Sequence, residues 1–454
     1  MLDMKANRRA ALCLAGALAL PAAAELSAAD VAKLGTTLTP VGAEKGANAA
    51  GTIPAWDGGI TKPMPNFKPG QAYPNPYASD KPTLIITGQN ADQYKANLTE
   101  GQVAMLKKYP DYKMVVYPTR RSASFPACHY EETKQCAPVA KLAPGGNGVV
   151  GCSGGIPFPE PKDGNEAIWN TLLRYRGDTF AMHWSQAAVT RGGDYALVKF
   201  EYEYDFSYGN CSKPASQREP NKVLNYLQST TAPARLAGQI LLVHETVDQA
   251  KEPRSAWTYN PGQRRVRLAP NVAYDNPGTA ADGLRTNDDF GMFNGATDRY
   301  NWKLVGKREM YIPYNSYALS DPKLKYSDIL KPGHINQDLA RYELHRVWVV
   351  DATLKPGTSH IYSRRVFYID EDSWAVVAID KYDGRGELWR FAEQHNENWY
   401  NVPMFFGTVE VHNDLQSGRY IAMGLRNEES VIYEPIKRSA ADYTPNNLRG
   451  LGTR

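Results

Sequence analysis

The chain lacks the signatures of several function classes. Its 454 residues carry a formal net charge of only +4, so no sequence-wide field attracts nucleic acid. It has no GxxxxGK[ST] loop, no HExxH pair and no CxxC, which excludes a standard P-loop and the common zinc motifs. We therefore expect no nucleic-acid partner, no cofactor and no metal site.

Two apparent motifs in the glycine-rich run 145–155 are expected to be accidental. Residues 146–151 fit the GxGxxG dinucleotide pattern, and residues 151–155 fit the GxSxG nucleophile elbow. Both motifs work only between a strand and a helix. Here Pro144 precedes the run and a proline-rich stretch follows it, so neither element is expected. No catalytic residue is predicted, and we expect the protein not to be an enzyme.

The first 24 residues have the pattern of a signal peptide. A basic start leads into an apolar run at 10–20, and an Ala-x-Ala sequence ends at Ala24. The apolar run is about half of the ~20 residues that span a bilayer. Cys13 lies at the start of this run, which argues against a lipoprotein anchor. We expect export across the inner membrane, cleavage after Ala24 and a periplasmic location.

Four cysteines remain after that cleavage: Cys128, Cys136, Cys152 and Cys211. An even number of cysteines in an oxidising compartment predicts two disulfides, with three possible pairings. We prefer Cys128–Cys136, which closes a short loop, together with Cys152–Cys211. A zinc site is disfavoured because the thiols lack tight spacing.

Prolines and glycines divide the chain into a signal peptide, an arm and a body. Residues 25–89 hold one helical candidate at 27–34 and are otherwise rich in turn formers, which predicts an extended arm over the surface. Residues 90–454 are expected to form a β-rich domain with a Gly/Pro-rich, cysteine-bearing loop at 118–161. Helical patterns in this domain cover residues 90–108 and 165–173.

Strand patterns dominate from residue 195 onward. Within 195–206, Tyr202, Tyr204 and Phe206 alternate with acidic residues, which is the period of a β-strand. Further strands are expected at residues 238–247, 256–268 (a hairpin with its turn at 260–263), 301–312, 342–354, 363–370, 374–380 and 387–394. Short turns without alternating helices predict a mainly β (α+β) fold with a large antiparallel sheet.

Charged clusters offer further candidate sites. Residues 287–289 and 370–372 are acidic enough to hold calcium. The first group lacks the ligand spacing of an EF-hand and the second is expected to form a hairpin turn, so solvated loops are favoured. Arginine side chains can read carboxylate or phosphate groups, although a solvated face paired with nearby acids is the preferred interpretation here. The arginines concerned are Arg264, Arg265, Arg267, Arg364 and Arg365.

The body contains β-patterns that resemble those of the LolA/LolB lipoprotein-carrier superfamily. They are the hairpin at 256–267 and the strand–turn–strand unit at 367–388. The mature chain as a whole more specifically resembles the family catalogued as domain of unknown function 1329 (DUF1329). The segments that carry this resemblance are LTPVGAE at 38–44, GTIPAW at 51–56, GGIPFP at 154–159 and WKLVGK at 302–307.

This resemblance implies an unclosed, curved antiparallel barrel of the LolA/LolB type, a periplasmic location and no known catalytic residues. Family members commonly accompany an RND-type inner-membrane exporter and an outer-membrane barrel protein. We therefore expect a periplasmic carrier or chaperone for a hydrophobic or lipid-like molecule between the two membranes. The alternatives are an envelope assembly factor that binds another protein, and a periplasmic enzyme or glycan binder.

The hairpin at 256–268 is the candidate contact with such a cargo. Its ligand-binding candidates are Trp257, Tyr259, Arg265 and Arg267. If they share the concave face, an aromatic floor with an arginine rim would suit an acyl chain ending in carboxylate or phosphate. If the face is the outer one, Trp257 is exposed or covered by the arm, and the arginines are solvated.

Overall fold

A computed structural model describes residues 26–270, 272–429, 431–436 and 438–452. The expected signal peptide 1–24, with its cleavage site and Cys13, lies outside the described residues. No helix in the described ranges is both long and apolar enough to cross a membrane.

The described chain is built mainly from β-strands. These are β1 (Leu84–Thr87), β2 (Lys113–Val116), β3 (Lys141–Leu142), β4 (Val149–Val150), β5 (Thr179–Val189), β6 (Tyr195–Phe206), β7 (Lys222–Ala232), β8 (Ile240–Thr246), β9 (Ser255–Asn260), β10 (Arg265–Leu268), β11 (Tyr300–Pro313), β12 (Tyr342–Leu354), β13 (Arg364–Asp370), β14 (Val376–Tyr382), β15 (Leu388–Trp399), β16 (Met404–Asp414), β17 (Tyr420–Leu425) and β18 (Tyr433–Glu434). The α-helices are α1 (Ala28–Val31), α2 (Glu100–Lys108), α3 (Ala127–Cys136), α4 (Gly164–Leu173), α5 (Tyr326–Ile329) and α6 (Pro445–Leu451).

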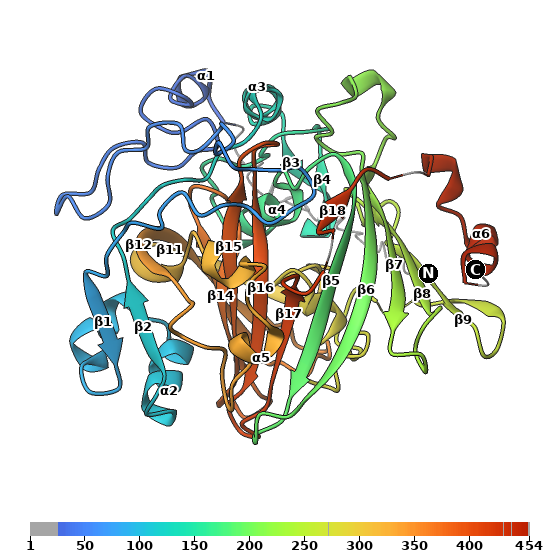
Figure 1. Ribbon diagram of the computed structural model, residues 1–454. Coiled ribbons are helices and arrows are strands. Elements are labelled where there is room, and N and C mark those ends of the chain that lie inside the picture. Colours follow the sequence, from blue (N-terminus) through green and yellow to red (C-terminus); the bar gives the residue numbers. More distant parts are fainter. Residues whose placement is uncertain (1–25, 271, 430, 437, 453–454) are drawn as a thin grey trace, which may run out of the picture.

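Sixteen of the strands form one sheet (Figure 1). Its path runs β1-β2-β12-β13-β14-β15-β16-β17-β5-β6-β7-β8-β9-β10, while β11 pairs with β12 and β18 with β5. The pairings are antiparallel except for a parallel bridge from Tyr342 to Val116. Among the described strands the two ends of the path do not pair with each other, so the sheet stays unclosed. The predicted mainly β fold with a large, unclosed antiparallel sheet is confirmed.

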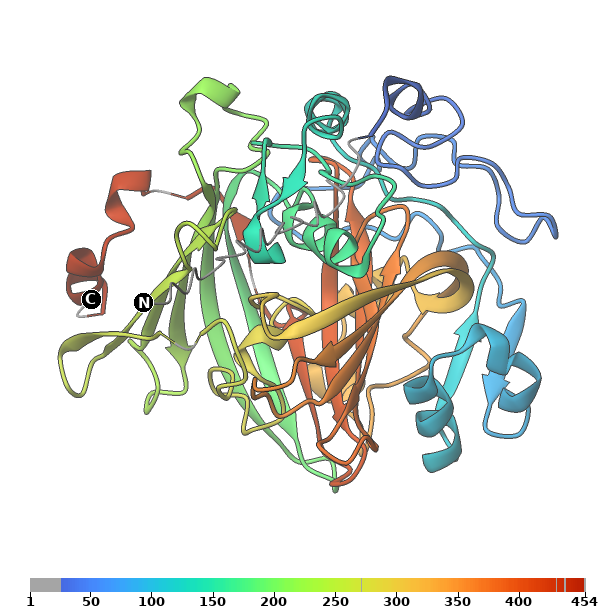
Figure 2. The same cartoon turned by 180° about the vertical axis from the view of Figure 1, so that it is seen from behind.

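Successive side chains of a strand point to opposite faces of the sheet, so each strand presents apolar side chains to both faces. On β6, Tyr204 and Phe206 join the inner core, which also contains Trp169 of α4. Helix α4 packs against β11 and β12 on this side (the teal helix near the centre of Figure 2). Helix α4 begins where the Asp163 side chain accepts the Glu166 backbone N–H at 2.9 Å, as an N-cap does.

Three separate segments cover the outer face of the sheet. Residues 88–112, between β1 and β2, pack over β12–β15, and residues 317–339 pack over β5, β16 and β17. Ile436 and residues 438–451, which include α6, pack over β7–β9 (red, beside β8 and β9 in Figure 1). The middle strands are therefore buried on both faces, in contrast to a sheet with one solvated side.

Residues 26–83 run irregularly over one end of the body and include only the short helix α1 (blue in Figure 1). They are tied down at several points. The Trp374 indole N–H donates to the Val41 carbonyl at 2.9 Å, and Tyr73 stacks on Trp399 with ring centroids 5.1 Å apart. Strand β1 falls within the range 25–89 and pairs with β2, so the end of that range belongs to the sheet.

All four described cysteines form disulfides, but the preferred pairing is wrong. The bonds are Cys128–Cys211 and Cys136–Cys152, with Cα–Cα distances of 5.9 and 5.2 Å. Cys128 and Cys136 lie near the two ends of α3, which interrupts the predicted loop at 118–161. Eight residues of helix separate Cα atoms by ~12 Å, whereas a disulfide requires ~4.4–6.8 Å. The helix itself therefore forbids the pairing that closes the short loop.

Candidate binding cavity

A cavity of about 130 Å³ lies between the inner face of the sheet and the connection from β10 to β11. Side chains from β5, β6, β7, β8, β16 and β17 all reach it, so this face of the curved sheet is the concave one. Six aromatic side chains supply much of its wall: Trp184, Tyr204, Phe206, Tyr226, Phe290 and Phe406.

The aromatic wall is packed face to face and edge to face. Trp184 stacks on Tyr202 with ring centroids 4.5 Å apart. Phe290, which comes from the β10–β11 connection, lies 5.6 Å from Tyr226 and 6.3 Å from Trp184. Such rings offer large apolar area and, in the tyrosines, a polar tip. The wall suits a ligand with an apolar body.

The β10–β11 connection, here called the inner segment (residues 272–298), closes one side of the cavity. The Gln186 amide donates to the carbonyls of Thr279 and Ala280 at 2.9 and 2.8 Å. The Arg390 guanidinium donates to the Gly283 carbonyl at 2.8 Å, and the Met292 backbone N–H donates to Glu410 at 3.2 Å. These contacts hold the inner segment against the sheet.

Two buried ion pairs strengthen this attachment. Asp288 lies 2.8 Å from Arg365, and Asp289 lies 2.8 Å from Lys381, all four side chains being almost fully buried. The favoured interpretation of residues 287–289 as a solvated loop is therefore wrong. Arg365 is likewise not on a solvated face, although its pairing with an acid is as expected. Burial raises the pKa of Asp288, but Arg365 and His360 more than offset this and hold it at about 2.

The ion pair at Lys381 continues to the cavity wall through His412. The Lys381 ammonium donates to His412 Nδ1 at 2.9 Å, and His412 Nε2 lies 2.7 Å from Glu410, which lines the cavity. Since an ammonium can only donate, the neutral ring carries its proton on Nε2 and donates it to Glu410. Burial and the Lys381 charge lower the pKa of His412, in keeping with a neutral ring.

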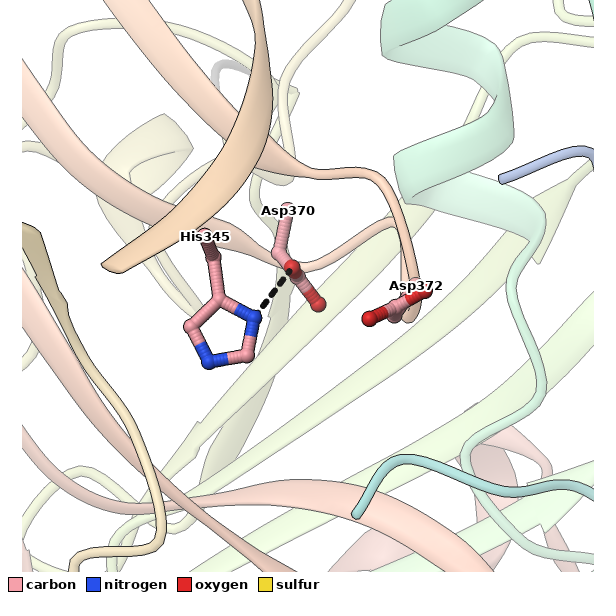
Figure 3. Close-up of side chains that lie close together, drawn as sticks. All are labelled: His345, Asp370 and Asp372. Carbon is pink, nitrogen blue, oxygen red and sulfur yellow. Dashed lines mark ion pairs between the residues drawn. The ribbon is translucent and has the colours of Figure 1, made fainter. Parts of the chain in front are cut away.

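A second buried cluster combines His345, Asp370 and Asp372 (Figure 3). One potential ligand atom from each residue lies within 4.8 Å of the others. His345 Nδ1 is 4.0 Å from Asp370, and its Nε2 is 3.0 Å from Glu343. Burial and the neighbouring Asp372 charge raise the pKa of Asp370 to about 7.

The partners of this cluster favour a structural role over metal binding. The Arg121 guanidinium donates hydrogen bonds to both carboxylate oxygens of Asp372, at 2.6 and 2.8 Å, and the Ser373 hydroxyl donates to Asp370 at 2.5 Å. Arg121 also donates to the Glu44 carbonyl at 2.7 Å and thereby binds the N-terminal residues to the sheet. Asp370 ends β13, and Glu371 and Asp372 lie in the turn to β14, but the expectation that these residues are solvated is wrong.

The hairpin of β9 and β10 does not bring the four predicted ligand residues together. Arg267 pairs with Thr258 and Arg265 with Asn260, so both arginines lie on the face opposite to Trp257 and Tyr259. The expectation that an arginine shares the aromatic face is wrong. For Arg265 or Arg267 to lie on that face, β10 would have to pair with β9 in a register shifted by one residue from the one that the turn sets.

The aromatic face of this hairpin is the outer one. Trp257 and Tyr259 pack with Leu448 of α6, so the C-terminal residues cover them rather than the N-terminal arm. Arg265 and Arg267 are exposed. None of the four residues lines the cavity. Their role in cargo binding stays a prediction.

A sequence pattern identifies some of the residues that line the cavity, but not the others. Tyr204 and Phe206 belong to the alternating set recognised on β6, and both line the cavity. Arg174, Arg176 and Arg285 also line it, but they stand outside the strands, so no periodic pattern marks them.

The chain is similar to known proteins over most of its length. A family profile described as "Protein of unknown function (DUF1329)" matches residues 85–449. "Uncharacterized protein PA3922" from Pseudomonas aeruginosa is 55% identical over 440 residues, which cover 96% of this chain and 96% of that protein.

Solved structures with a similar arrangement share little sequence. A DUF1329 family protein from Desulfovibrio piger is 14% identical, with a TM-score of 0.39, and the match covers 59% of this chain and 91% of that one. The LolA superfamily protein NE2245 from Nitrosomonas europaea is 13% identical, with a TM-score of 0.37, covering 63% and 98%.

Proposed function

The chain belongs to the DUF1329 family, as its sequence predicted, and from that premise we propose that it is a carrier or chaperone for a hydrophobic or lipid-like molecule. It would work in the periplasm, between the inner and outer membranes. An RND-type exporter and an outer-membrane barrel protein are its proposed partners.

The observation that carries this proposal is the aromatic cavity on the concave side of an unclosed sheet. Binding cavities for small molecules are concave and mostly apolar, with a few polar groups that orient the ligand. The cavity meets this description, since Trp184 and Phe290 form part of its wall and Gln228 and Gln394 supply amides. Two disulfides support an oxidising compartment such as the periplasm.

Titration with benzene, an uncharged apolar probe of the size that a cavity of this volume accepts, tests the cavity itself. Leu241 lines the cavity from β8, so Leu241→Trp should fill part of it. We expect this variant to bind the probe at least about tenfold more weakly, a loss of ~1.4 kcal/mol. The matched variant Leu241→Met conserves volume and should bind as the wild type does. Equal affinity in all three folded proteins, or no binding by the wild type, would refute the proposed cavity function.

A further inference from the structure

The cavity wall carries an excess of buried positive charge. Glu245 and Glu410 are its carboxylates, and Glu397 pairs with Arg426 at 2.8 Å behind the wall. Five arginines against these three carboxylates leave two positive charges in excess. The five are Arg174, Arg176, Arg254, Arg285 and Arg426.

Three of these arginines have no carboxylate partner in the described part of the chain. Arg254 pairs with Glu245 at 2.7 Å, and Arg426 with Glu397. By contrast, Arg174, Arg176 and Arg285 form no ion pair with any described acid. Among the described residues, the side chain of each donates one hydrogen bond, to a backbone carbonyl nearby in sequence, at 2.7, 2.9 and 3.1 Å respectively. The Nε of each is buried and has no hydrogen-bond partner in this part of the chain.

These guanidinium groups are also poorly hydrated. Arg174 is only 8% exposed and Arg285 only 3%. Burial, together with the charge of Arg176, outweighs the opposing charge of Glu410 and lowers the pKa of Arg174 to about 9. A guanidinium has five N–H donors and a charge that costs several kcal/mol to remove from water without a counter-charge.

A purely structural explanation accounts for only part of this arrangement. Arg174 and Arg176 donate to the carbonyls of Thr171 and Leu172, at the C-terminal end of α4, where a cation is favourable. Each carbonyl, however, satisfies one donor of five and carries only a fraction of a charge. Arg285 has no such helix end, since its bond is to the adjacent Thr286.

The same arginines lie against the aromatic wall. The guanidinium carbon of Arg176 is 5.3 Å from the ring centre of Phe206, and that of Arg285 is 5.6 Å from the ring centre of Phe290. Both rings line the cavity. An anionic group and an apolar body would thus find their partners side by side.

We propose that the cavity recognises an anionic amphiphile, whose carboxylate or phosphate is bound by Arg174, Arg176 and Arg285 while its apolar part lies against Phe206 and Phe290. This inference rests on the proposed carrier function and adds the chemical class of the cargo. Arginine suits the role because its planar fork matches both anions.

The volume of the cavity limits how much of the cargo enters it. At about 130 Å³ it is close to the ~150 Å³ engineered cavity that accepts benzene. The cavity as it stands in this structure therefore has room for the anionic group and a ring-sized or short-chain portion next to it. A longer chain requires the inner segment to move or the chain to leave through the cavity opening.

Calorimetric titration with decanoate and with 1-decanol, at concentrations below micelle formation, separates the anionic group from the chain. We expect the wild type to bind decanoate at least about tenfold more tightly than decanol. Inorganic phosphate alone should bind far more weakly than decanoate, because it lacks the apolar part.

Arg174→Gln and Arg285→Gln should each weaken decanoate binding about tenfold and leave decanol binding unchanged. Arg385→Gln, on an exposed turn, is the surface-charge control and should change neither. The thermal midpoint of the ligand-free protein provides a second readout. It should rise in Arg174→Gln, because the change removes a buried charge that the helix end and the more distant Glu410 offset only in part. A purely structural arginine would give the opposite shift.

The outcomes distinguish the two proposals. If decanoate and decanol bind equally and the arginine variants change nothing, the anionic-cargo inference is overturned while the carrier function stands. If neither compound binds, both proposals are overturned. If phosphate alone binds as tightly as decanoate, the site recognises a free anion, and the amphiphile inference is overturned.

Discussion

Individual buried carboxyl groups make the free energy of unfolding of this protein depend on pH. Glu393 is fully enclosed and accepts hydrogen bonds from Gln102 and Tyr342, each at 3.0 Å, and from Tyr112 at 3.3 Å. Burial raises its pKa from 4.5 to about 7. Between these two values the unfolded chain releases a proton that the folded chain keeps, so stability falls as the pH rises through this window.

Glu393→Gln should remove this dependence and keep most of the hydrogen bonds. We expect the variant to gain stability relative to the wild type as the pH rises from about 4.5 to 7, by up to ~3 kcal/mol. Denaturant unfolding measured from pH 4 to 8 gives the comparison. Glu387→Gln, on an exposed turn of the same hairpin, is the control. Parallel pH profiles for Glu393→Gln and the wild type would contradict the assignment.

For individual residues, the sequence reveals clusters of one chemical type but not the side chains that they contact in the folded protein. The acidic residues 287–289 were recognised as a cluster, but nothing local reveals that Asp289 meets Lys381. Asp289 and Lys381 are far apart in the sequence and come together only when the protein folds. Arg174 is a similar case, since an unpaired arginine in a cavity looks like any other arginine in a sequence.

Among the elements, α3 explains why the cysteine pairing was missed. Its residues carry no strong apolar period, and they lie between proline-rich and glycine-rich stretches that suggest a loop. Once the helix is formed, Cys128 and Cys136 face different neighbours. Cys128 meets Cys211 beyond β6, and Cys136 meets Cys152.

Peptide mapping without reduction should therefore find Cys128 linked to Cys211 and Cys136 linked to Cys152. The bonds span 83 and 16 residues. Removing the longer one by a double Cys→Ser change should cost roughly 4–5 kcal/mol, against roughly 3 for the shorter, because it closes the larger loop. A fragment linking Cys128 to Cys136 would contradict the structure.

Strand prediction was most accurate for β6 and β12, whose bounds agree with the strands expected at 195–206 and 342–354. An alternation of aromatic and acidic residues marks β6 in the sequence. Strands β5 and β16 were not predicted. Both are buried on the two faces, by the inner core and by residues 317–339, so their sequences lack a regular apolar–polar alternation.

On the scale of the whole molecule, the unclosed sheet is filled rather than empty. The inner segment occupies much of its concave side, and buried ion pairs fix it there. The family resemblance predicted the sheet, but the segment that narrows its cavity has no periodic pattern and could not be predicted. What remains is a small aromatic and cationic cavity, which the predicted ligand residues of the hairpin do not line.

The central claim is that this cavity holds a cargo, and the protein as purified from its native cells tests it most directly. Compounds extracted from the wild type should include an anionic amphiphile, identified by mass spectrometry at close to one per chain. The cavity-filled variant Leu241→Trp should carry much less. A wild type that repeatedly carries no amphiphile, or a filled variant that carries as much as the wild type, would contradict the account.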